Sequence, residues 1–213
     1  MKNIVLYIML LVSPLLSALF FDGEDDYVQI HNPFSDGSPY QNHFSITASI
    51  VLDEPTTQND EFIYIHRAAY HDIGLKLDGT DLTFRVLCAA NHFHEITVDI
   101  ADLIGTGDPI VIAGTYDHDK QKLFVNGNLI QEVSWSHDVN WVAAFEYEAI
   151  GISFNDIRYF NGFINEIAVF GYTLSEAEIL NASMGFGMYK HSSEFFYDFV
   201  QGEDEQVLYD VSG

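Results

Sequence analysis

Apolar and polar residues alternate along most of this chain in short runs. In FSITASIVL, residues Ile46, Ala48 and Ile50 face one side of a predicted strand, and the polar residues between them face the other. Similar runs recur from Tyr27 onward, including GLKLDGTDLTFRV and EITVDI. A period of two is typical of β-strands with one buried face. The chain is therefore predicted to consist mainly of antiparallel strands.

Turn residues separate these runs at close intervals. Asp78-Gly79 joins two predicted strands, a second turn covers Asp117 to Lys120, and a third is Asn126-Gly127. Asn-Gly is the strongest short hairpin signal, because both central residues of a type I′ turn take positive φ angles. Short strands, regular turns and almost no helix indicate an all-β fold. At this length a two-sheet antiparallel sandwich of about a dozen strands is the simplest packing.

The stretch YFNGFINEIAVFGYTLSEAEIL, Tyr159 to Leu180, combines a strand with a helix. Residues from Phe163 to Phe170 alternate without interruption in the predicted strand. Ser175 and Glu178 have the spacing of a capping box, which predicts the start of a helix. Only about two helical turns follow before Gly185. We therefore predict one short helix on the C-terminal side that covers the edge of a sheet.

Charge and composition narrow the classes of partner. The chain has 213 residues, of which 8 are basic and 32 acidic, and its net charge is −24. Its aromatic content of 15% is that of a folding chain. A surface this negative repels nucleic acids and anionic membranes at long range, so neither is an expected partner. It suits cations or a partner with a basic face.

The first residues predict the destination of the protein. MKNIVLYIMLLVSPLLSALF has one Lys, an apolar run from Ile4 to Val12, and small residues at Ser17 and Ala18. This is typical of a signal peptide over residues 1–18, and so of a secreted protein without membrane insertion after cleavage. An uncleaved anchor or a buried first strand is the alternative. Cys88 is the lone cysteine, so the domain is expected to contain no internal disulfide.

Four blocks of sequence together resemble a known family. They are LFFDGEDDYVQI (Leu19 to Ile30), HFSITASIVLDEP (His43 to Pro55), VIAGTYDHDKQKLFVNGNLI (Val111 to Ile130) and FNGFINEIAVFGYTLSEAEI (Phe160 to Ile179). In this order and spacing they are similar to the signature blocks of laminin-G-like modules of the concanavalin A-like lectin/glucanase superfamily. The resemblance implies a jelly-roll sandwich over residues 19–213. It also implies a non-catalytic recognition module that binds a glycan or an extracellular protein.

The C-terminal segment departs from the family pattern. Relatives usually open with a strand that reads like YYFDEGSGTTVYDSSG, and this strand is missing before the FDG block. EFFYDFVQGEDEQVLYDVSG, residues 194–213, is similar to it. Two interpretations follow: a second module that is cut short, or an opening strand displaced to the other end of the same domain. For the second, we predict that Phe195 to Val200 lies antiparallel beside the closing strand, Asn165 to Phe170.

The acidic turn DGEDDY, which begins at Asp22, is the candidate metal site. Ca²⁺ takes six to eight oxygen ligands, and a tight turn with Asp22, Asp25 and Asp26 can supply several. The resemblance implies a structural calcium in many such modules, with a contribution from a closing-strand carboxylate. Asn165 takes the place of that carboxylate here and offers an oxygen without a charge. The alternative is a solvated acidic turn without a cation.

Catalytic patterns are weaker. Hydrolases of the same superfamily use carboxylates on a strand that reads like E-x-D-x-E, and the nearest match is FEYEAIG, with Glu146 and Glu148 on one face. This pair supports the alternative function of a glycoside hydrolase, unless both are solvated carboxylates at a strand edge. A purely structural or adhesion module is the third possibility, and it predicts a large apolar outer patch.

Histidine and tryptophan residues leave further alternatives open. His92 and His94 share one face of a predicted strand, either as two metal ligands or as part of a polar outer face. Trp135 and Trp141 flank SHDVN and are either core residues or platforms for a sugar ring. None of these patterns identifies a ligand, so the glycan-binding residues stay unassigned.

Overall fold

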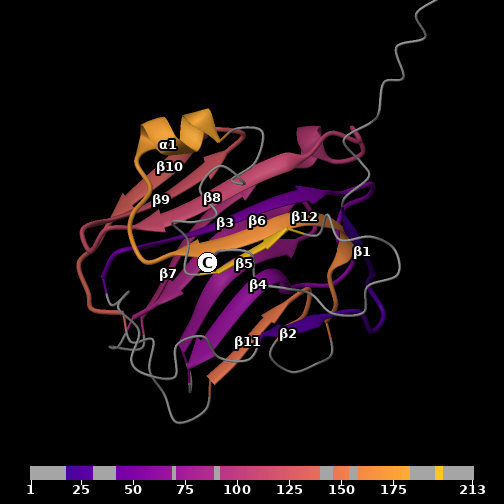
Figure 1. The fold of residues 1–213 in the computed structure, drawn as a ribbon, viewed down its shortest axis with the longest axis horizontal. Helices are drawn as coiled ribbons and strands as arrows, with labels where there is room; N and C mark the ends of the chain where they lie inside the picture. Colours follow the sequence, from indigo (N-terminus) through magenta and orange to yellow (C-terminus); the bar gives the residue numbers. More distant parts are fainter. Residues whose placement is uncertain are drawn as a thin grey trace, which may run out of the picture.

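Two antiparallel sheets face each other in this protein (Figure 1). The computed structural model describes residues 18–30, 42–68, 71–88, 92–139, 146–153, 158–182 and 195–198. The first sheet has the strand order β1-β12-β3-β8-β9-β10, with β13 also paired to β12. The second sheet has the order β2-β11-β4-β5-β6-β7. The predicted all-β, two-sheet antiparallel sandwich is therefore confirmed.

The strand bounds follow the predicted runs closely. The first sheet contains β1 (Leu19–Asp22), β3 (Phe44–Val51), β8 (Ile110–Tyr116), β9 (Lys120–Val125), β10 (Asn128–Ser134), β12 (Asn161–Phe170) and β13 (Phe195–Asp198). The second contains β2 (Val28–Ile30), β4 (Glu61–Ala68), β5 (His71–Asp78), β6 (Asp81–Leu87), β7 (Phe93–Asp99) and β11 (Glu146–Ile150). The described helices are η2, a 3-10 helix (Ala101–Leu103), and α1 (Glu176–Asn181). No helix in the described residues is long and apolar enough to cross a membrane.

The core lies between the two sheets. Ile46 and Ile50 of β3 are fully buried against residues of the opposite sheet such as Leu75 and Phe84. Each such side chain contributes roughly 1.5–3 kcal/mol when it leaves water. Gly114 on β8 leaves room for the Phe84 ring, because a Cβ at this position would lie 2.6 Å from it.

Hairpin turns set the register of neighbouring strands. Asn126 and Gly127 have φ angles of 50° and 77°, which confirms the predicted two-residue turn between β9 and β10. The Asn126 side-chain oxygen also accepts a hydrogen bond of 2.8 Å from the backbone N–H of Val111. In the β5–β6 hairpin, Asp78 pairs with Asp81, so this turn lies one residue later than predicted.

β12 does not alternate without interruption. A register shift at Asn165 separates the pair Ile164–Ile50 from the pair Glu166–Ser49. Both Ile164 and Ile167 consequently face the core, three residues apart. The prediction of strict alternation was wrong because a β-bulge inserts one extra residue, which a simple period of two cannot show.

The helix α1 is present as predicted, and it contacts β10, the edge strand of the first sheet. The Ser175 side chain accepts a hydrogen bond from the Glu178 backbone, and Glu178 returns one, which confirms the capping box. Ile179 is buried in an apolar cluster with Val111 and Phe124 on the outer face of the first sheet, and Figure 1 shows α1 beside β9 and β10. The helix therefore covers the apolar outer face of the first sheet in addition to contacting its edge strand.

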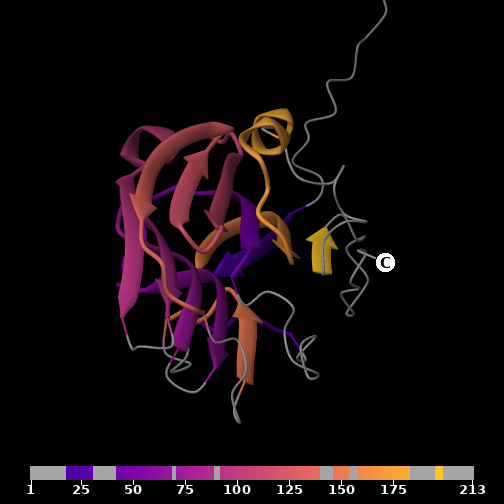
Figure 2. The same cartoon turned by 90° about the vertical axis from the view of Figure 1, so that its left-hand side faces the viewer.

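Two strands share the free side of β12. β1 pairs antiparallel with residues 161–164, and β13 pairs antiparallel with residues 166–169. Figure 2 shows β13, in yellow, beside the orange strand β12. The antiparallel pairing expected for the segment after Phe195 is thus present over the four residues of β13, whereas residues 199 and 200 lie outside the described chain. The domain limits, 1–18 and 19–213, and the origin of residues 194–213 as a displaced opening strand remain predictions.

Candidate functional site

An acidic turn follows β1 at one end of the sandwich. One carboxylate oxygen from each of Asp22, Asp25 and Asp26 lies within 4.8 Å of the others. The turn is closed by two hydrogen bonds, from the Asp22 N–H to Asp26 Oδ2 (3.1 Å) and from the Glu24 N–H to Asp22 Oδ1 (2.8 Å). Gly23, at φ 79°, makes this tight turn possible. Three negative charges so close together favour a bound cation.

A cavity of about 190 Å³ lies beside this turn. Its lining residues are Phe20, Asp53, Glu54, Asn161 and Gly162. Asn161 is the register partner of Asp22, so the cavity and the turn are neighbours. Position 162 requires glycine, because a Cβ there would lie 2.8 Å from a backbone oxygen of β3.

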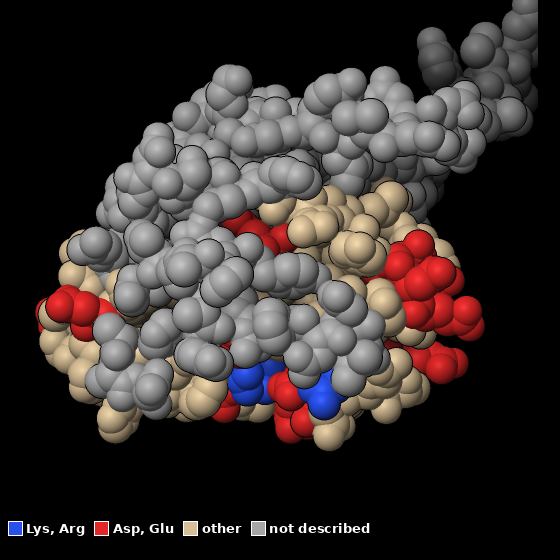
Figure 3. All heavy atoms as spheres, turned by 90° about the horizontal axis from the view of Figure 1, so that it is seen from below, with Lys and Arg blue, Asp and Glu red and all other residues tan. Residues whose placement is uncertain are grey.

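We call this end of the molecule the acidic rim. It comprises the turn residues Asp22, Asp25 and Asp26 together with the cavity residues Phe20, Asp53, Glu54, Asn161 and Gly162. Figure 3 shows acidic side chains, in red, gathered on the side of the molecule where Figure 1 places β1 and β2. The rim therefore combines hydrogen-bond acceptors with an exposed aromatic ring.

Two asparagines of the closing strand lie at different places relative to the acidic turn. The Asn165 side-chain nitrogen donates a hydrogen bond of 3.1 Å to Ser49 Oγ on β3. Asn165 lies four residues along β12 from Asn161, which is roughly 13 Å in an extended strand. The contribution of Asn165 to a calcium site remains a prediction, whereas Asn161 is the β12 residue beside the acidic turn.

The remaining cavity residues follow a strand end that the sequence alone did not single out. Asp53 and Glu54 are the second and third residues after β3, and Phe20 precedes a buried Phe21 on β1. The antiparallel pairing of β3 and β12 could have indicated these residues, because the C-terminal end of β3 lies beside the N-terminal end of β12.

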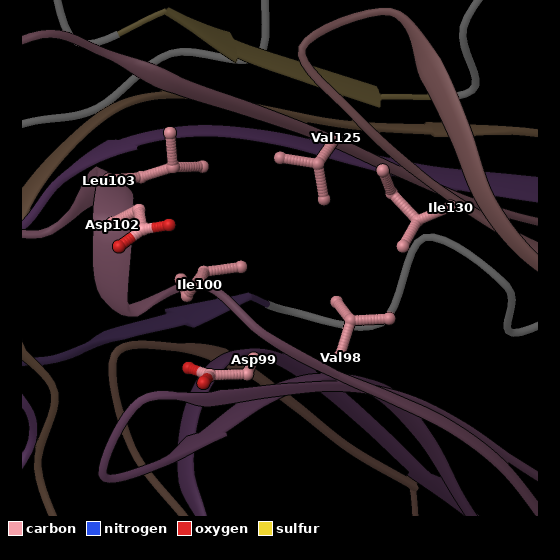
Figure 4. Close-up of a pocket in the computed structure, with 7 residues that line it drawn as sticks. All are labelled: Val98, Asp99, Ile100, Asp102, Leu103, Val125 and Ile130. Atoms are coloured by element: carbon pink, nitrogen blue, oxygen red, sulfur yellow. The ribbon is translucent and has the colours of Figure 1, made fainter.

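A second, smaller cavity opens at the same end, between the sheet edges. It has a volume of about 110 Å³, and Figure 4 shows its lining residues: Val98, Asp99, Ile100, Asp102, Leu103, Val125 and Ile130. Its walls are mainly aliphatic. A hydrogen bond from the Ala101 N–H lowers the pKa of Asp99, which is therefore charged at neutral pH. The cavity offers an apolar slot with two carboxylates and little other chemistry.

Basic side chains gather on one carboxylate rather than at either cavity. Lys76 Nζ lies 2.5 Å from Asp60 Oδ1, Arg158 Nη1 lies 3.1 Å from Asp60 Oδ2, and Arg85 Nη2 lies 3.8 Å from Asp60 Oδ1. Figure 3 shows basic groups, in blue, next to acidic ones. Each of these cations is neutralised by a neighbour, so they do not form an anion-binding site.

The carboxylate pair considered for catalysis is not an exposed strand-edge pair. Glu148 is only 3% exposed, so its expectation as a solvated carboxylate was wrong. The Tyr64 hydroxyl donates a hydrogen bond to Glu148 Oε1, and His66 Nδ1 lies 3.9 Å from Glu148 Oε2. Glu146 belongs to β11, but its side chain lies outside the described part. A hydrolase needs both groups at an open cleft, whereas Glu148 is enclosed in the core.

Histidine and aromatic residues meet at the other end of the sandwich. Trp135 is 9% exposed and is stacked between His94 (ring centroids 3.8 Å apart) and Tyr116 (4.1 Å), which confirms it as a core residue. Trp141 lies outside the described residues. The polar outer face is the wrong interpretation for His94, because it shares the inner face with Val86, its register partner. Burial and the neighbouring imidazoles of His137 and His92 lower the pKa of His94.

Comparisons with known proteins agree with this architecture. Residues 22–180 match the family model described as the concanavalin A-like lectin/glucanases superfamily, in its laminin G group. A search of curated proteins finds no match. The family match covers the acidic turn and β12 alike.

Three solved structures illustrate the shared fold. A candidate carbohydrate-binding protein from Bacteroides ovatus has a TM-score of 0.65 and 17% identity, over 92% of this chain and 56% of that one. Domains LG4-5 of the mouse laminin α1 chain have a TM-score of 0.58 and 15% identity, over 92% and 46%. The CBM40 module of a Ruminococcus gnavus sialidase, bound to α2,3-sialyllactose, has a TM-score of 0.59 and 14% identity, over 78% and 96%.

These similarities concern the fold, because the identities are low. The chain spans about half the length of the first solved structures that it matches, at 46%, 47% and 56%. The family assignment rests on the sequence match itself, which extends over most of the chain. The chain therefore belongs to the laminin-G-like group of the concanavalin A-like lectin/glucanase superfamily.

Proposed function

We propose that this protein is a secreted, non-catalytic recognition module that binds a glycan at the acidic rim. The observation that carries the proposal is an exposed aromatic ring at the margin of a cavity lined by carboxylates. Phe20 is 52% exposed and stands beside Asp53 and Glu54. A sugar ring has one apolar C–H face and several hydroxyl groups, so it needs both kinds of surface at once.

The rim is suited to these two demands. The Phe20 ring is supported from behind by Phe163, with ring centroids 4.9 Å apart, and therefore presents a fixed apolar platform. The Asp53 and Glu54 carboxylates accept hydrogen bonds from sugar hydroxyls, and such charge-assisted bonds are strong. Gly162 keeps the floor of the cavity free of a side chain.

Calcium is the cofactor that we propose for the rim. Asp22, Asp25 and Asp26 supply oxygen ligands from one turn, and the Asn161 side chain adjoins them from β12. Ca²⁺ tolerates irregular oxygen cages that include water. Its charge offsets the mutual repulsion of the three carboxylates and holds the turn against the cavity.

Two of the related structures support a glycan ligand. The Bacteroides ovatus protein is described as a candidate carbohydrate binder, and the Ruminococcus gnavus module was solved with a sialylated sugar. Secretion is supported by the pattern of residues 1–18, which lie almost wholly outside the described chain. N-terminal sequencing of protein from a secreting host should find a start near Ala18 or Leu19. An intact Met1 would contradict secretion by this route.

A glycan array probed with and without Ca²⁺ tests the binding function. Phe20→Ala should weaken binding to any glycan found by about tenfold, because the variant loses the aromatic platform. Phe93→Ala is the matched control, since Phe93 is equally exposed (56%) but lies at the other end of the sandwich. Equal binding by the wild type and Phe20→Ala, or an equal loss in Phe93→Ala, would rule out the rim as the binding site.

A further inference from the structure

Three metal-ligating side chains converge at the end of the sandwich opposite the acidic rim. We call Cys88, His94 and His137 the histidine cluster. Cys88 directly follows β6, His94 lies on β7, and His137 lies in the segment after β10. One ligand atom from each lies within 4.8 Å of the other two. The cluster joins an edge strand of the second sheet to the segment that leaves the edge strand of the first.

An unsatisfied polar atom marks this cluster. His94 Nε2 is buried and has no hydrogen-bond partner among the described residues. Buried polar atoms are nearly always paired, so such an exception calls for an explanation, and ligation of a metal ion is one. The Cys88 thiol is fully buried and has no cysteine partner.

The surrounding hydrogen bonds hold two of the ligands in place. Gln121 is fully buried and donates from Nε2 to the backbone oxygens of Phe84 (2.9 Å) and His94 (3.3 Å). Its Oε1 accepts a hydrogen bond of 2.9 Å from Trp135 Nε1, and the Trp135 ring is stacked on His94. Gln121 thereby links the strand that carries His94 to the ring that orients it. Such outer contacts are typical of metal ligands.

A second anchor positions the remaining imidazole. The Tyr116 hydroxyl donates a hydrogen bond of 2.8 Å to the backbone oxygen of His137. His92 stacks on His137 with ring centroids 5.9 Å apart and is the next imidazole in reach.

We propose that Cys88, His94 and His137 bind a divalent ion of the zinc class. A thiolate and two neutral imidazoles suit Zn²⁺, which prefers sulfur and nitrogen in a tetrahedral arrangement. The bond lengths of such a site place its ligand atoms roughly 3.3–3.6 Å apart, so a cluster whose ligand atoms lie within 4.8 Å of one another needs to contract by no more than about 1.5 Å. His137 is exposed and lies outside any strand, so its side chain has room to move.

The fourth position of the tetrahedron is open to water or to His92. On binding, the Cys88 thiol releases its proton to solvent and ligates as the thiolate. The bound ion links the two sheets where the chain has no disulfide, because its ligands come from both sides of the sandwich.

Metal titration of the whole, reduced protein tests this proposal. After treatment with chelator, Co²⁺ should produce the visible d–d bands of a tetrahedral site together with a near-ultraviolet thiolate charge-transfer band, and Zn²⁺ should displace it. His137→Ala should weaken Zn²⁺ binding by at least roughly tenfold with little loss of stability. His43→Ala removes an exposed histidine outside the cluster and should bind like the wild type.

Cys88→Ser separates the site from adventitious surface chelation. This variant should lose the charge-transfer band, and His137→Ala provides the parallel test should the buried substitution prevent folding. Asp22→Ala should leave Zn²⁺ binding unchanged, because the acidic rim lies at the opposite end. The proposal is overturned if wild-type protein gives no thiolate band, if His137→Ala retains wild-type affinity, or if His43→Ala loses as much as His137→Ala.

Discussion

The two ends of the sandwich present different ligand atoms on different kinds of support. The acidic rim offers carboxylate oxygens from a turn whose residues Asp22 and Asp25 are exposed. The histidine cluster offers sulfur and nitrogen, from a fully buried Cys88 and a partly buried His94. Hard cations prefer the first set, and zinc-class ions prefer the second.

The difference follows from how each end is built. At the acidic rim the chain supplies ligands from consecutive residues of one turn, so local sequence decides the site. At the histidine end the ligands come from three separate segments, and Gln121 and Tyr116 hold these segments together from the core. The first end is therefore a surface turn, whereas the second joins an exposed His137 to a buried Cys88 and a partly buried His94.

The largest expected effect is the loss of Trp135. Trp135→Ala should lower the free energy of unfolding by roughly 3–5 kcal/mol, because it leaves a cavity and removes the partner of Gln121. Phe20→Ala at the acidic rim should change it by no more than about 0.5 kcal/mol, as for other exposed residues. Urea denaturation of both variants measures the contrast. Equal losses would show that the two ends do not differ in their coupling to the core.

The sequence predicted the sandwich but only part of the contrast between its two ends. Strand alternation and the Asn-Gly turn predicted the sandwich, because both signals act within neighbouring residues. Alternation also placed His92 and His94 on one face. It could not show that this face is the inner one, since an edge strand carries polar residues on either side.

The rest depended on contacts between distant segments. His137 lies close to Cys88, which comes from the other sheet. The sequence around residue 137 does not indicate this contact. The bulge at Asn165 shifts the register of β12. Asn165 occupies the position where the family resemblance implies a calcium ligand, and its side chain donates a hydrogen bond to Ser49. Both features arise from tertiary packing, which single-strand patterns do not encode.

Calcium should stabilise the protein through the acidic rim alone. At 100 times its dissociation constant, Ca²⁺ should add about 2.7 kcal/mol to the free energy of unfolding, and Asp22→Ala should remove most of this gain. Asp108→Ala is the matched control, with the same charge change at an exposed residue outside the turn.

The same measurement decides between the two asparagines of β12. Asn161→Ala should reduce the calcium effect more than Asn165→Ala, because Asn161 adjoins the turn. A larger loss of the calcium effect in Asn165→Ala would show that Asn165 is the calcium ligand on β12. Melting curves that do not respond to Ca²⁺ or chelator would end the proposal of a calcium site.

Removal of residues 194–213 should affect the two halves of β12 unequally. The deletion exposes residues 166–169, which pair with β13, and leaves the β1 pairing at 161–164 intact. Four lost register pairs should cost roughly 1–3 kcal/mol. Calcium binding at the acidic rim should persist. An unchanged melting temperature would favour a truncated second module over a displaced strand.

The smallest expected effect concerns Glu61, a buried carboxyl behind the acidic rim. Glu61 is 1% exposed; its Oε1 accepts a hydrogen bond of 2.9 Å from the Gln58 N–H, and its Oε2 has no partner among the described residues. Burial raises the pKa of Glu61, and the backbone N–H groups of Gln58, Asn161 and Thr57 oppose this shift only in part. The folded protein therefore favours the neutral carboxyl more than the unfolded chain does.

A raised pKa in the folded state gives a definite sign to the pH dependence. The stabilisation from Glu61 is present below the unfolded pKa, near 4.5, and is lost as pH rises through the folded value. Glu61→Gln stays neutral at every pH and keeps one acceptor oxygen for Gln58. The variant should thus gain stability relative to the wild type as the pH rises from 4 to 7. Urea denaturation of the variant and the wild type at both pH values measures this change. The other carboxylates titrate alike in the two proteins, so their effect cancels in the difference between the free energies of unfolding. If the difference in stability between the variant and the wild type is the same at both pH values, burial does not raise the pKa of Glu61, and water reaches this carboxyl behind the acidic rim.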